Sequence, residues 1–244
     1  MGTRRRTAAG VRNVTALLLA AVLAACGPQG DPPTPPSAPA TSASPATSLA
    51  PGELLRQAVR TMLDAPSKRL TGTASVSVTS HEFDVIYVGD DAAGTHTNRA
   101  MGLVSVVEFV RIGESLYLRA DEHYWQAFVN LEQLHLVVDK WVLVSAGKPN
   151  HASLLVLESD RTRWEPVTVT PIGPDTIDGV RVLVLRDDAG QRFSVAAEGA
   201  PYLLRFEGTQ STEAGEASVE IAFSEFGTVQ ETITAPSGEV VDLR

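Results

Sequence analysis

The sequence predicts an α+β domain, in which a large antiparallel sheet is accompanied by an N-terminal helix and an inserted helix. Three observations support this prediction. Apolar residues recur at helical spacing over 53–63, they alternate with polar residues in several segments between 70 and 224, and they return to helical spacing over 121–139. Runs of strands with separate helices are typical of α+β folds.

Residues 53–63 predict the first helix. Pro51 precedes this segment and Pro66 follows it, as expected at the two ends of a helix. The apolar residues form one stripe, which consists of Leu54, Leu55, Ala58, Val59, Met62 and Leu63. An amphipathic helix of this kind either lies on a membrane surface or packs on a sheet, and we expect it to pack on the sheet.

From residue 70 onward the period changes to two, which indicates strands. Val76 and Val78 alternate with serine and threonine, and the clearest strands lie within 177–224, where turns containing glycine separate them. We expect these segments to form antiparallel strands with one apolar face. On that face lie Tyr202, Leu204 and Phe206 of one strand, and Val219, Ile221 and Phe223 of the next.

Residues 121–139 interrupt the strands with a predicted helix. Asp121 and Glu122 stand in its first turn, where acidic residues interact favourably with the helix dipole. Its apolar stripe holds Tyr124, Phe128, Leu131, His135 and Val138. Residues 140–145 return to a strand pattern, and 149–160 fit either a short helix or a covering loop.

The first 25 residues have the order of an export signal. Four arginines precede an apolar run from Val14 to Ala25, and small residues end this run. A bilayer-spanning helix needs about 20 apolar residues, which is more than this run contains. We therefore expect cleavage after Ala25 and no retained membrane helix.

Cys26 is the only cysteine of the chain and directly follows that apolar run. Residues 23–26 have the sequence LAAC, which resembles the lipobox of bacterial lipoproteins. The resemblance implies that the Cys26 thiol receives a diacylglyceryl group, and two or three acyl chains would anchor the chain stably in a membrane. The alternative is an ordinary cleavage site followed by a cysteine without a role. A single cysteine cannot form a disulfide within the chain.

The sequence divides into three parts. We expect residues 1–25 to be a lipoprotein signal peptide and 26–51 to be the lipidated cysteine and a disordered tether rich in Pro, Ser, Thr and Ala. We expect 52–244 to be the folded domain. Removal of the four signal-peptide arginines from 20 basic residues leaves 16 against 29 acidic residues, a net charge of −13. This charge argues against binding of nucleic acid or of an anionic lipid surface through a basic face.

The sequence contains no motif for catalysis or metal binding. The five histidines form no HExxH motif, and no second cysteine is present to complete a metal site. The segment Asp121-Glu122-His123 is rich in metal-ligand types, but adjacent helical residues point in different directions. We therefore expect no enzyme activity, no catalytic residues, no metal and no cofactor.

Large aromatic residues gather in and near the predicted insertion. These residues are Trp125, Phe128, Trp141 and Trp164. Two interpretations remain open at this point. The aromatic residues either complete a closed core, or they border an apolar cavity that is left where the helices and the sheet do not close fully.

The order of these parts resembles actinobacterial lipoproteins of the LppX/LprG type, within the wider LolA-like group. After the lipobox, tether and first helix come residues 112–118 with the sequence IGESLYL, Tyr124-Trp125, and Lys140-Trp141-Val142. The chain then ends with Tyr202-Leu203-Leu204, residues 221–224 with the sequence IAFS, and Ala235-Pro236.

The resemblance implies a sheet curved as a half-barrel around helices, an apolar pocket for acyl chains, and no catalytic residues. A pocket of this kind is defined by its apolar side chains. Its candidate residues in this chain are Tyr117, Trp125, Phe128, Trp141, Tyr202, Phe206 and Phe223.

We therefore expect an exported lipoprotein that the lipid on Cys26 anchors to the outer face of the cell membrane. It would bind an acylated lipid or lipoglycan in an apolar cavity, for transport or presentation. The alternative is a non-enzymatic envelope sensor or scaffold, with a closed core, that contacts another envelope protein. The expected partners are thus the membrane, a lipid or lipoglycan and, in the alternative, an envelope protein.

Overall fold

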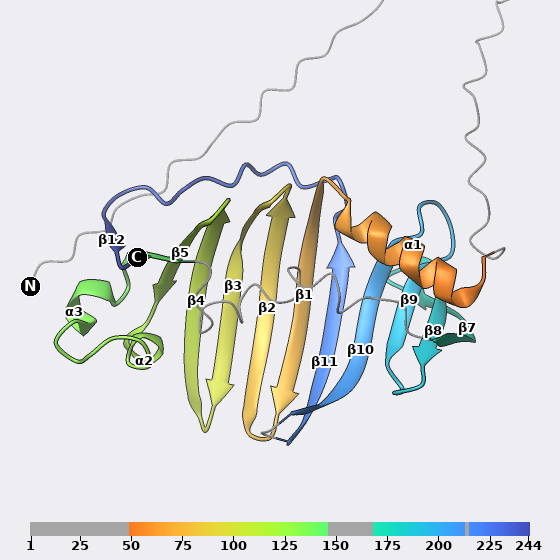
Figure 1. Ribbon diagram of the computed structural model, residues 1–244, viewed down its shortest axis with the longest axis horizontal. Coiled ribbons are helices and arrows are strands. Elements are labelled where there is room, and N and C mark those ends of the chain that lie inside the picture. The colour runs from red at the N-terminus through yellow and green to blue at the C-terminus, as the bar shows by residue number, and fades with distance from the viewer. Residues whose placement is uncertain (1–48, 146–167, 213–214) are drawn as a thin grey trace, which may run out of the picture. The chain divides into compact units, whose positions relative to one another are not determined.

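The computed structural model describes residues 49–145, 168–212 and 215–244, and in these ranges it shows one open sheet of twelve strands (Figure 1). The strand order is β12-β6-β5-β4-β3-β2-β1-β11-β10-β9-β8-β7. Neighbouring strands are antiparallel, except that β12 runs parallel to β6. The sheet is curved as a half-barrel and does not close, so the predicted α+β class is confirmed.

The strands follow the alternating segments of the sequence. Their bounds are β1 Ser67–Val76, β2 Thr79–Val88, β3 Asp91–Ala100, β4 Leu103–Ile112, β5 Ser115–Ala120, β6 Trp141–Ser145, β7 Val169–Ile177, β8 Val180–Asp187, β9 Arg192–Ala196, β10 Leu203–Thr212, β11 Gly215–Ser224 and β12 Val240–Asp242. The strands β1–β6 and β7–β11 form two antiparallel runs, and the pairing of β1 with β11 joins them into one sheet.

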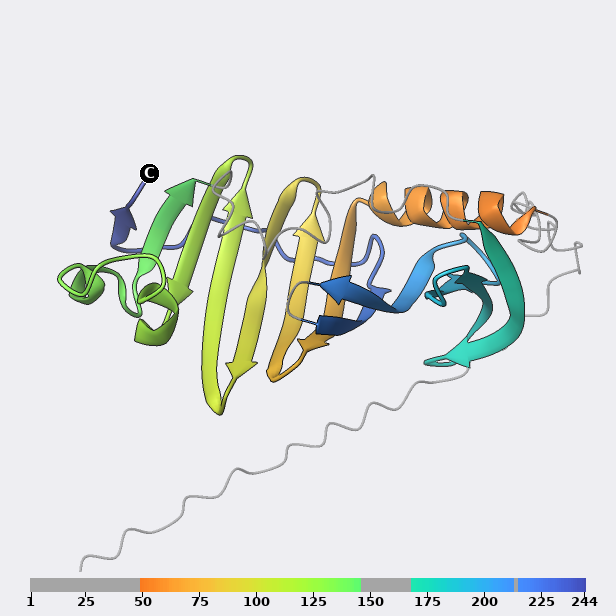
Figure 2. The same cartoon turned by 60° about the horizontal axis from the view of Figure 1, so that its bottom comes forward.

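Helix α1, Pro51–Leu63, is the predicted N-terminal helix. Pro51 occupies the first turn, where its missing N–H leaves no hydrogen bond unmade. Leu54, Leu55, Ala58, Val59 and Met62 of the predicted stripe are buried. The helix packs on the end of the sheet formed by β7, β9 and β10 (Figures 1 and 2), so the expected packing on the sheet is confirmed.

The predicted inserted helix is present as two short helices, α2 Glu122–Trp125 and α3 Leu134–Val137. A turn at Asn130 separates them, because the Asn130 side-chain oxygen accepts a hydrogen bond from the Gln133 backbone N–H at 3.1 Å. The predicted stripe is consequently broken. Trp125 and Leu134 are buried, whereas Leu131 of the predicted stripe is 77% exposed.

The two faces of the sheet differ in chemistry. The face that carries Leu70, Phe109 and Leu118, here called the core face, holds the buried apolar residues of the alternating pattern. The opposite face, here called the outer face, carries ion pairs such as Arg69–Asp84 and Arg119–Glu108. Alternation of side chains along each strand produces this division.

The two edges of the sheet are short or irregular. Strand β12 has three residues, and β7 at the other edge contains Pro171 and Pro174 with an irregular register between Pro171 and Gly173. Before β12, the chain runs along the ends of strands β1–β5 (Figure 1). It is attached there by Ser67, whose carbonyl and hydroxyl oxygens accept hydrogen bonds from the Gly227 and Val229 N–H groups at 2.8 and 3.2 Å.

Candidate functional site

The candidate site is the core face in the middle of the sheet. Cross-strand pairing connects Leu70 to Val85, Gly94 to Phe109, Phe109 to Leu118, and Leu118 to Val142. On the other side of β1, Phe223 of β11 lies opposite Leu70. We call the row Phe223, Leu70, Val85, Phe109, Leu118 and Val142 the apolar strip. Its side chains are at most 5% exposed, so the strip forms a continuous buried apolar surface from β11 to β6.

A second row runs beside the apolar strip. It contains Leu185, Phe193, Phe206, Ile221, Phe83, His96, Val107 and Ala120 in cross-strand register. Phe193 and Phe206 contact each other with ring centroids 5.4 Å apart. The row is apolar apart from His96, which introduces a polar group into the centre of the core face.

His96 belongs to a histidine pair on β2 and β3. His81 Nδ1 and His96 Nε2 lie 3.0 Å apart, so one ring donates a hydrogen bond to the other. Phe83 stacks on His96 with a centroid distance of 4.8 Å and an interplanar angle of 4°. Burial, with a smaller contribution from the charge on His81, lowers the pKa of His96 from 6.5 to about 4, and burial also lowers the pKa of His81. Both rings are therefore neutral at pH 7.

The pKa of His96 predicts that acid weakens the fold between about pH 6.5 and pH 4. In this window the unfolded chain binds a proton that folded His96 does not, so the free energy of unfolding falls as the pH falls. We expect a loss of about 2 kcal/mol, after allowance for solvent screening. Urea unfolding at about pH 6.5 and at about pH 4 measures this change in the free energy of unfolding.

A His96→Phe variant keeps an aromatic ring beside Phe83 and serves as the comparison for this pH dependence. Its stability should change less than that of the wild type across the window. Asp84 does not interfere with the measurement. A hydrogen bond from Arg69 lowers the pKa of its carboxyl from 3.8, so the stability that Asp84 contributes is lost only at pH values below this window. Equal pH slopes in wild type and His96→Phe would contradict the prediction.

Aromatic residues of α2 flank the core face next to β4. Asp121 accepts hydrogen bonds from the Tyr124 N–H and the Ser105 hydroxyl, both at 2.9 Å, and so fixes the start of α2 to strand β4. Tyr124 then contacts Trp125 and Phe128, with ring centroids 5.2 and 4.8 Å away. Burial raises the pKa of Tyr124, whose phenol therefore stays protonated. Trp125 is fully buried.

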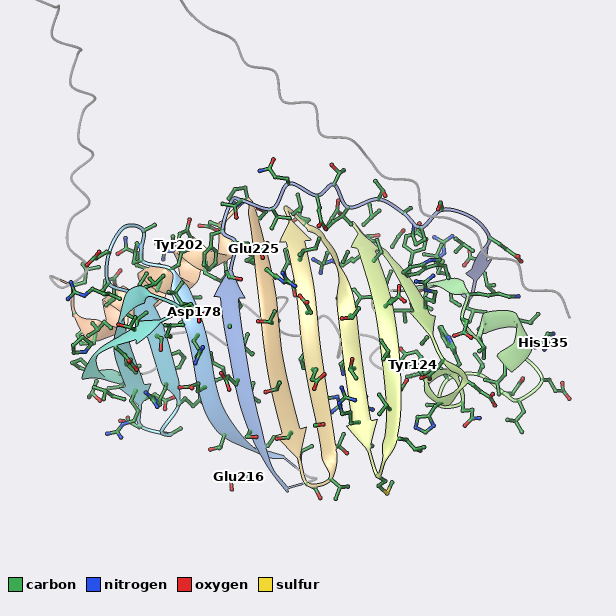
Figure 3. The ribbon with its side chains drawn as sticks, turned by 180° about the vertical axis from the view of Figure 1, so that it is seen from behind. Tyr124, His135, Asp178, Tyr202, Glu216 and Glu225 are labelled. Carbon is green, nitrogen blue, oxygen red and sulfur yellow. The ribbon has the colours of Figure 1, made fainter. Side chains whose placement is uncertain are left out.

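The structure places the seven candidate pocket residues in different surroundings. Trp125 and Phe223 are buried, Phe206 lies on the core face, and Phe128 is partly buried beside Tyr124. Tyr202 stacks on Phe226 at 4.0 Å, close to α1, and lies at the opposite end of the sheet from Tyr124 (Figure 3).

Tyr117 and Trp141 point away from these residues. Tyr117 lies between Leu116 and Leu118, which face the core, so strand alternation places it on the outer face. Trp141 likewise precedes buried Val142, and its ring lies under the Arg119 guanidinium at 5.0 Å. The structure thus brings Trp125 and Phe128 together through Tyr124, and it separates both from Tyr117 and Trp141.

Several predicted residues lie outside the described residues, namely Ala25, Cys26, Trp164 and the segment 149–160. Within the described ranges, no three His, Cys, Asp or Glu side chains are close enough to hold a metal ion. No helix in those ranges has both the length and the apolar composition required to span a membrane.

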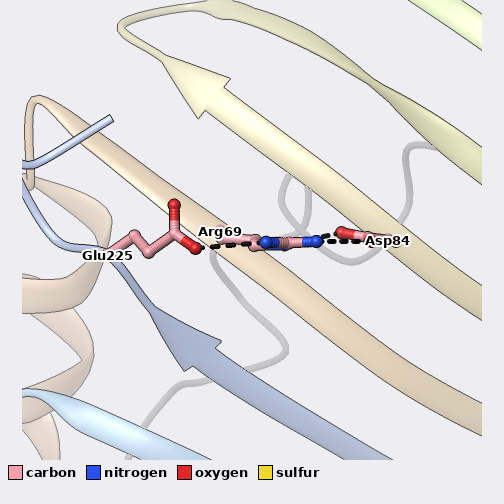
Figure 4. A network of polar contacts seen from close by, with 3 residues as sticks. All are labelled: Arg69, Asp84 and Glu225. Atoms are coloured by element: carbon pink, nitrogen blue, oxygen red, sulfur yellow. Dashed lines mark hydrogen bonds and ion pairs between the residues drawn. The ribbon is translucent and has the colours of Figure 1, made fainter. Parts of the chain in front are cut away.

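The outer face carries a polar network above β1 and β2. Arg69 donates two hydrogen bonds to the Asp84 carboxylate at 2.8 and 2.7 Å and a third to Glu225 at 3.2 Å (Figure 4). These contacts raise the pKa of Arg69. A groove of about 490 Å³ lies beside the network, between the sheet and residues 228–231.

Arg69→Ala is expected to lower the free energy of unfolding by about 1 kcal/mol. The pair is partly exposed, with side-chain exposures of 39% and 47%, and therefore contributes little despite its paired geometry. Chemical denaturation measures this change. Arg181→Ala is the matched control, since the Arg181–Glu198 pair is about 70% exposed on both sides. The expectation fails if the two variants lose equal stability.

Comparisons with known proteins reveal similarity at the level of structure only. No protein-family model matches the sequence, and no curated protein matches it. The structure of LprF from Mycobacterium bovis matches with a TM-score of 0.51 and 17% identity, over 77% of this chain and 97% of LprF. The Mycobacterium tuberculosis lipoprotein LppX matches with a TM-score of 0.46 and 14% identity, over 75% of this chain and 99% of LppX. The match to LprF shows that the two chains share a fold, as the predicted resemblance implies.

Proposed function

We propose that this chain is a membrane-anchored envelope lipoprotein whose core face binds the acyl chains of a lipid or lipoglycan, for transport or presentation. The observation that carries the proposal is the apolar strip, which crosses from β11 to β6 on one open sheet. The fold shared with LprF and the lipobox-like sequence at Cys26 support it.

Burial of apolar surface would supply the binding energy. Each Å² of apolar surface removed from water contributes about 25 cal/mol, so a few hundred Å² of acyl chain contributes several kcal/mol. Phe109 and Leu118 of the strip are at most 1% exposed. An acyl chain therefore reaches Phe109 and Leu118 only when the groups that cover the strip move apart. The acyl chain then replaces the contacts that those groups made with the strip.

One observation favours the alternative function. The same low exposure of Phe109 and Leu118 fits a closed core, and a closed core would leave the outer surface as the functional part of the molecule. In that case the chain is a sensor or scaffold that contacts another envelope protein, and the groove beside Arg69 is an accessible feature of its outer face.

Mass spectrometry of lipids extracted from the purified protein distinguishes the two functions. The protein should be prepared without its own lipid anchor, so that the acyl chains on Cys26 do not contribute to the extract. We expect about one lipid per protein if the core face is a binding site. A lipid-free preparation that also fails to take up a fluorescent fatty acid would overturn the proposal and favour the alternative.

A further inference from the structure

The two central strands β2 and β3 place a cluster of polar side chains within the apolar core face. Cross-strand register sets His81 opposite Asn98 and Phe83 opposite His96. These residues share the face of the apolar strip, since Val85 of the strip lies two residues beyond Phe83 on the same strand. We call His81, His96 and Asn98 the histidine site.

The histidine site has hydrogen-bonding capacity that is not used within the described part of the chain. His96 Nε2 is engaged with His81 Nδ1, whereas His96 Nδ1 and Asn98 Oδ1 are buried and have no hydrogen-bond partner among the described residues. Each unsatisfied buried polar atom costs about 1–3 kcal/mol. Both residues are intermediate in exposure as a whole, whereas these two atoms themselves are covered, so a ligand group reaches them only after a neighbouring group shifts. A ligand group that bonds to these two atoms would recover that cost.

The cross-strand neighbours of the histidine site carry no charge. Its cross-strand neighbours on the core face are Ala74 of β1 and Ser105 and Val107 of β4. The Asp121 side chain accepts hydrogen bonds from the Ser105 hydroxyl and the Tyr124 N–H. The two histidines are neutral at pH 7, because the pKa of each is lowered.

The cationic side chains of the core face, among the described residues, lie away from the histidine site. Lys68 and Arg111 belong to a row two side-chain positions away from His96, about 13 Å along the strands. Lys68 lies over the Tyr87 ring and near the Leu63 carbonyl, and Arg111 donates to the Asp90 carbonyl. Among the described residues, a phosphate at the histidine site would therefore meet no cation that compensates for its lost hydration.

We propose that the histidine site binds hydroxyl groups of the ligand's head, so that the ligand is an uncharged acylated glycerol or sugar lipid and not an anionic phospholipid. This inference rests on the proposed function. Asn98 Oδ1 only accepts a hydrogen bond, which excludes an ester carbonyl as its partner. His96 Nδ1 donates or accepts according to its tautomer, and a hydroxyl satisfies either case. His96 and Asn98 are two residues apart on one face, about 7 Å, a distance that neighbouring hydroxyls of glycerol or a sugar can span.

Photo-crosslinking with two matched probes tests the proposal on the full-length lipoprotein in phosphatidylcholine vesicles. One probe is a monoacylglycerol and the other the corresponding lysophosphatidic acid, with the same photoreactive acyl chain. We expect the wild-type protein to cross-link the glycerol probe about tenfold more than the phosphate probe. The combined change His96→Phe and Asn98→Leu should reduce the yield with the glycerol probe about tenfold, because two net hydrogen bonds are lost. The yield with the phosphate probe should stay low.

Two further variants distinguish a loss of ligand binding from a loss of folding. His135→Phe changes an exposed histidine on α3, at the edge of the molecule (Figure 3), and should leave both yields unchanged. His96→Gln keeps a donor and an acceptor and should retain most of the yield with the glycerol probe. Equal yields of the two probes in the wild type, or a double variant that folds and cross-links as the wild type does, would overturn the histidine site and leave acyl binding standing. Absence of cross-linking with either probe would overturn the proposed function itself.

Discussion

A Gly94→Ala substitution is expected to lower the free energy of unfolding by about 3 kcal/mol or more. Gly94 lies on β3 opposite Val85 of β2, where the two backbones approach closely. A Cβ atom at Gly94 would lie 2.2 Å from the Asp84 carbonyl oxygen and 2.8 Å from Val85 Cα. Both atoms belong to the backbone of β2, so the strands themselves must move apart, which costs more than the rearrangement of a side chain. Urea unfolding monitored by circular dichroism measures the change.

Two other glycines provide a graded comparison for Gly94. A Cβ atom at Gly72 would lie 2.7 Å from the Glu220 carbonyl oxygen, so Gly72→Ala should destabilise less than Gly94→Ala. Gly52, in the first turn of α1, has no atom within 4 Å of a Cβ position, and Gly52→Ala should be neutral or slightly stabilising. If the three variants were equally stable, the close approach of β2 and β3 would not exist in solution.

Cys26→Ala is expected to abolish incorporation of fatty acid into the protein. The chain contains no other cysteine to accept a diacylglyceryl group. Each acyl methylene contributes about 0.8 kcal/mol to membrane binding, so two or three chains give anchoring that is effectively permanent. Labelling of cells with a radioactive fatty acid, with mass spectrometry of the N-terminal peptide, measures the change. The wild type should carry the label and lack residues 1–25, and the variant should carry no label and retain them.

Ser37→Ala is the control for Cys26→Ala, since Ser37 is a hydroxyl residue of the tether that could accept an acyl group by ester formation. This variant should keep both the label and the processing of the wild type. Label that persists in Cys26→Ala would contradict the prediction. A wild-type chain that is cut after Ala25 without gaining label would instead identify an ordinary cleavage site.

The elements set by local pattern could be predicted from the sequence. The stripe of α1 and the alternation in β8–β11 each depend on residues close together in the chain, so periodicity alone identifies them. The break in the helix predicted for 121–139 could not be predicted from periodicity. Its interruption depends on one side-chain hydrogen bond at Asn130, and an apolar stripe carries no information about such a bond.

Placement of side chains on one face or the other needed the strand register. Tyr117 and Trp141 are aromatic and close in sequence to the buried residues, but alternation decides their face, and it places them on the outer face. Whether the other candidate pocket residues contact a lipid stays a prediction.

The histidine site was not recognised from the sequence, although a signal for it exists. The turn at Gly89-Asp90 joins β2 and β3, and a two-residue turn fixes which residues lie opposite each other. Counting outward from this turn pairs His81 with Asn98 and His96 with Phe83. Histidine spacing along the chain identifies metal and helix motifs, but it carries no information about cross-strand register.

The edges of the sheet also affect how copies of the protein behave when they are crowded together. An edge strand with free N–H and C=O groups can pair with the same strand of another copy and start aggregation. Pro171 and Pro174 remove two N–H donors from β7, and the irregular register at Gly173 disturbs the row of acceptors. The other edge is only three residues long. If a lipid on Cys26 confines copies to one surface, as we propose, they would meet each other frequently, and edges of this kind would keep them as separate molecules.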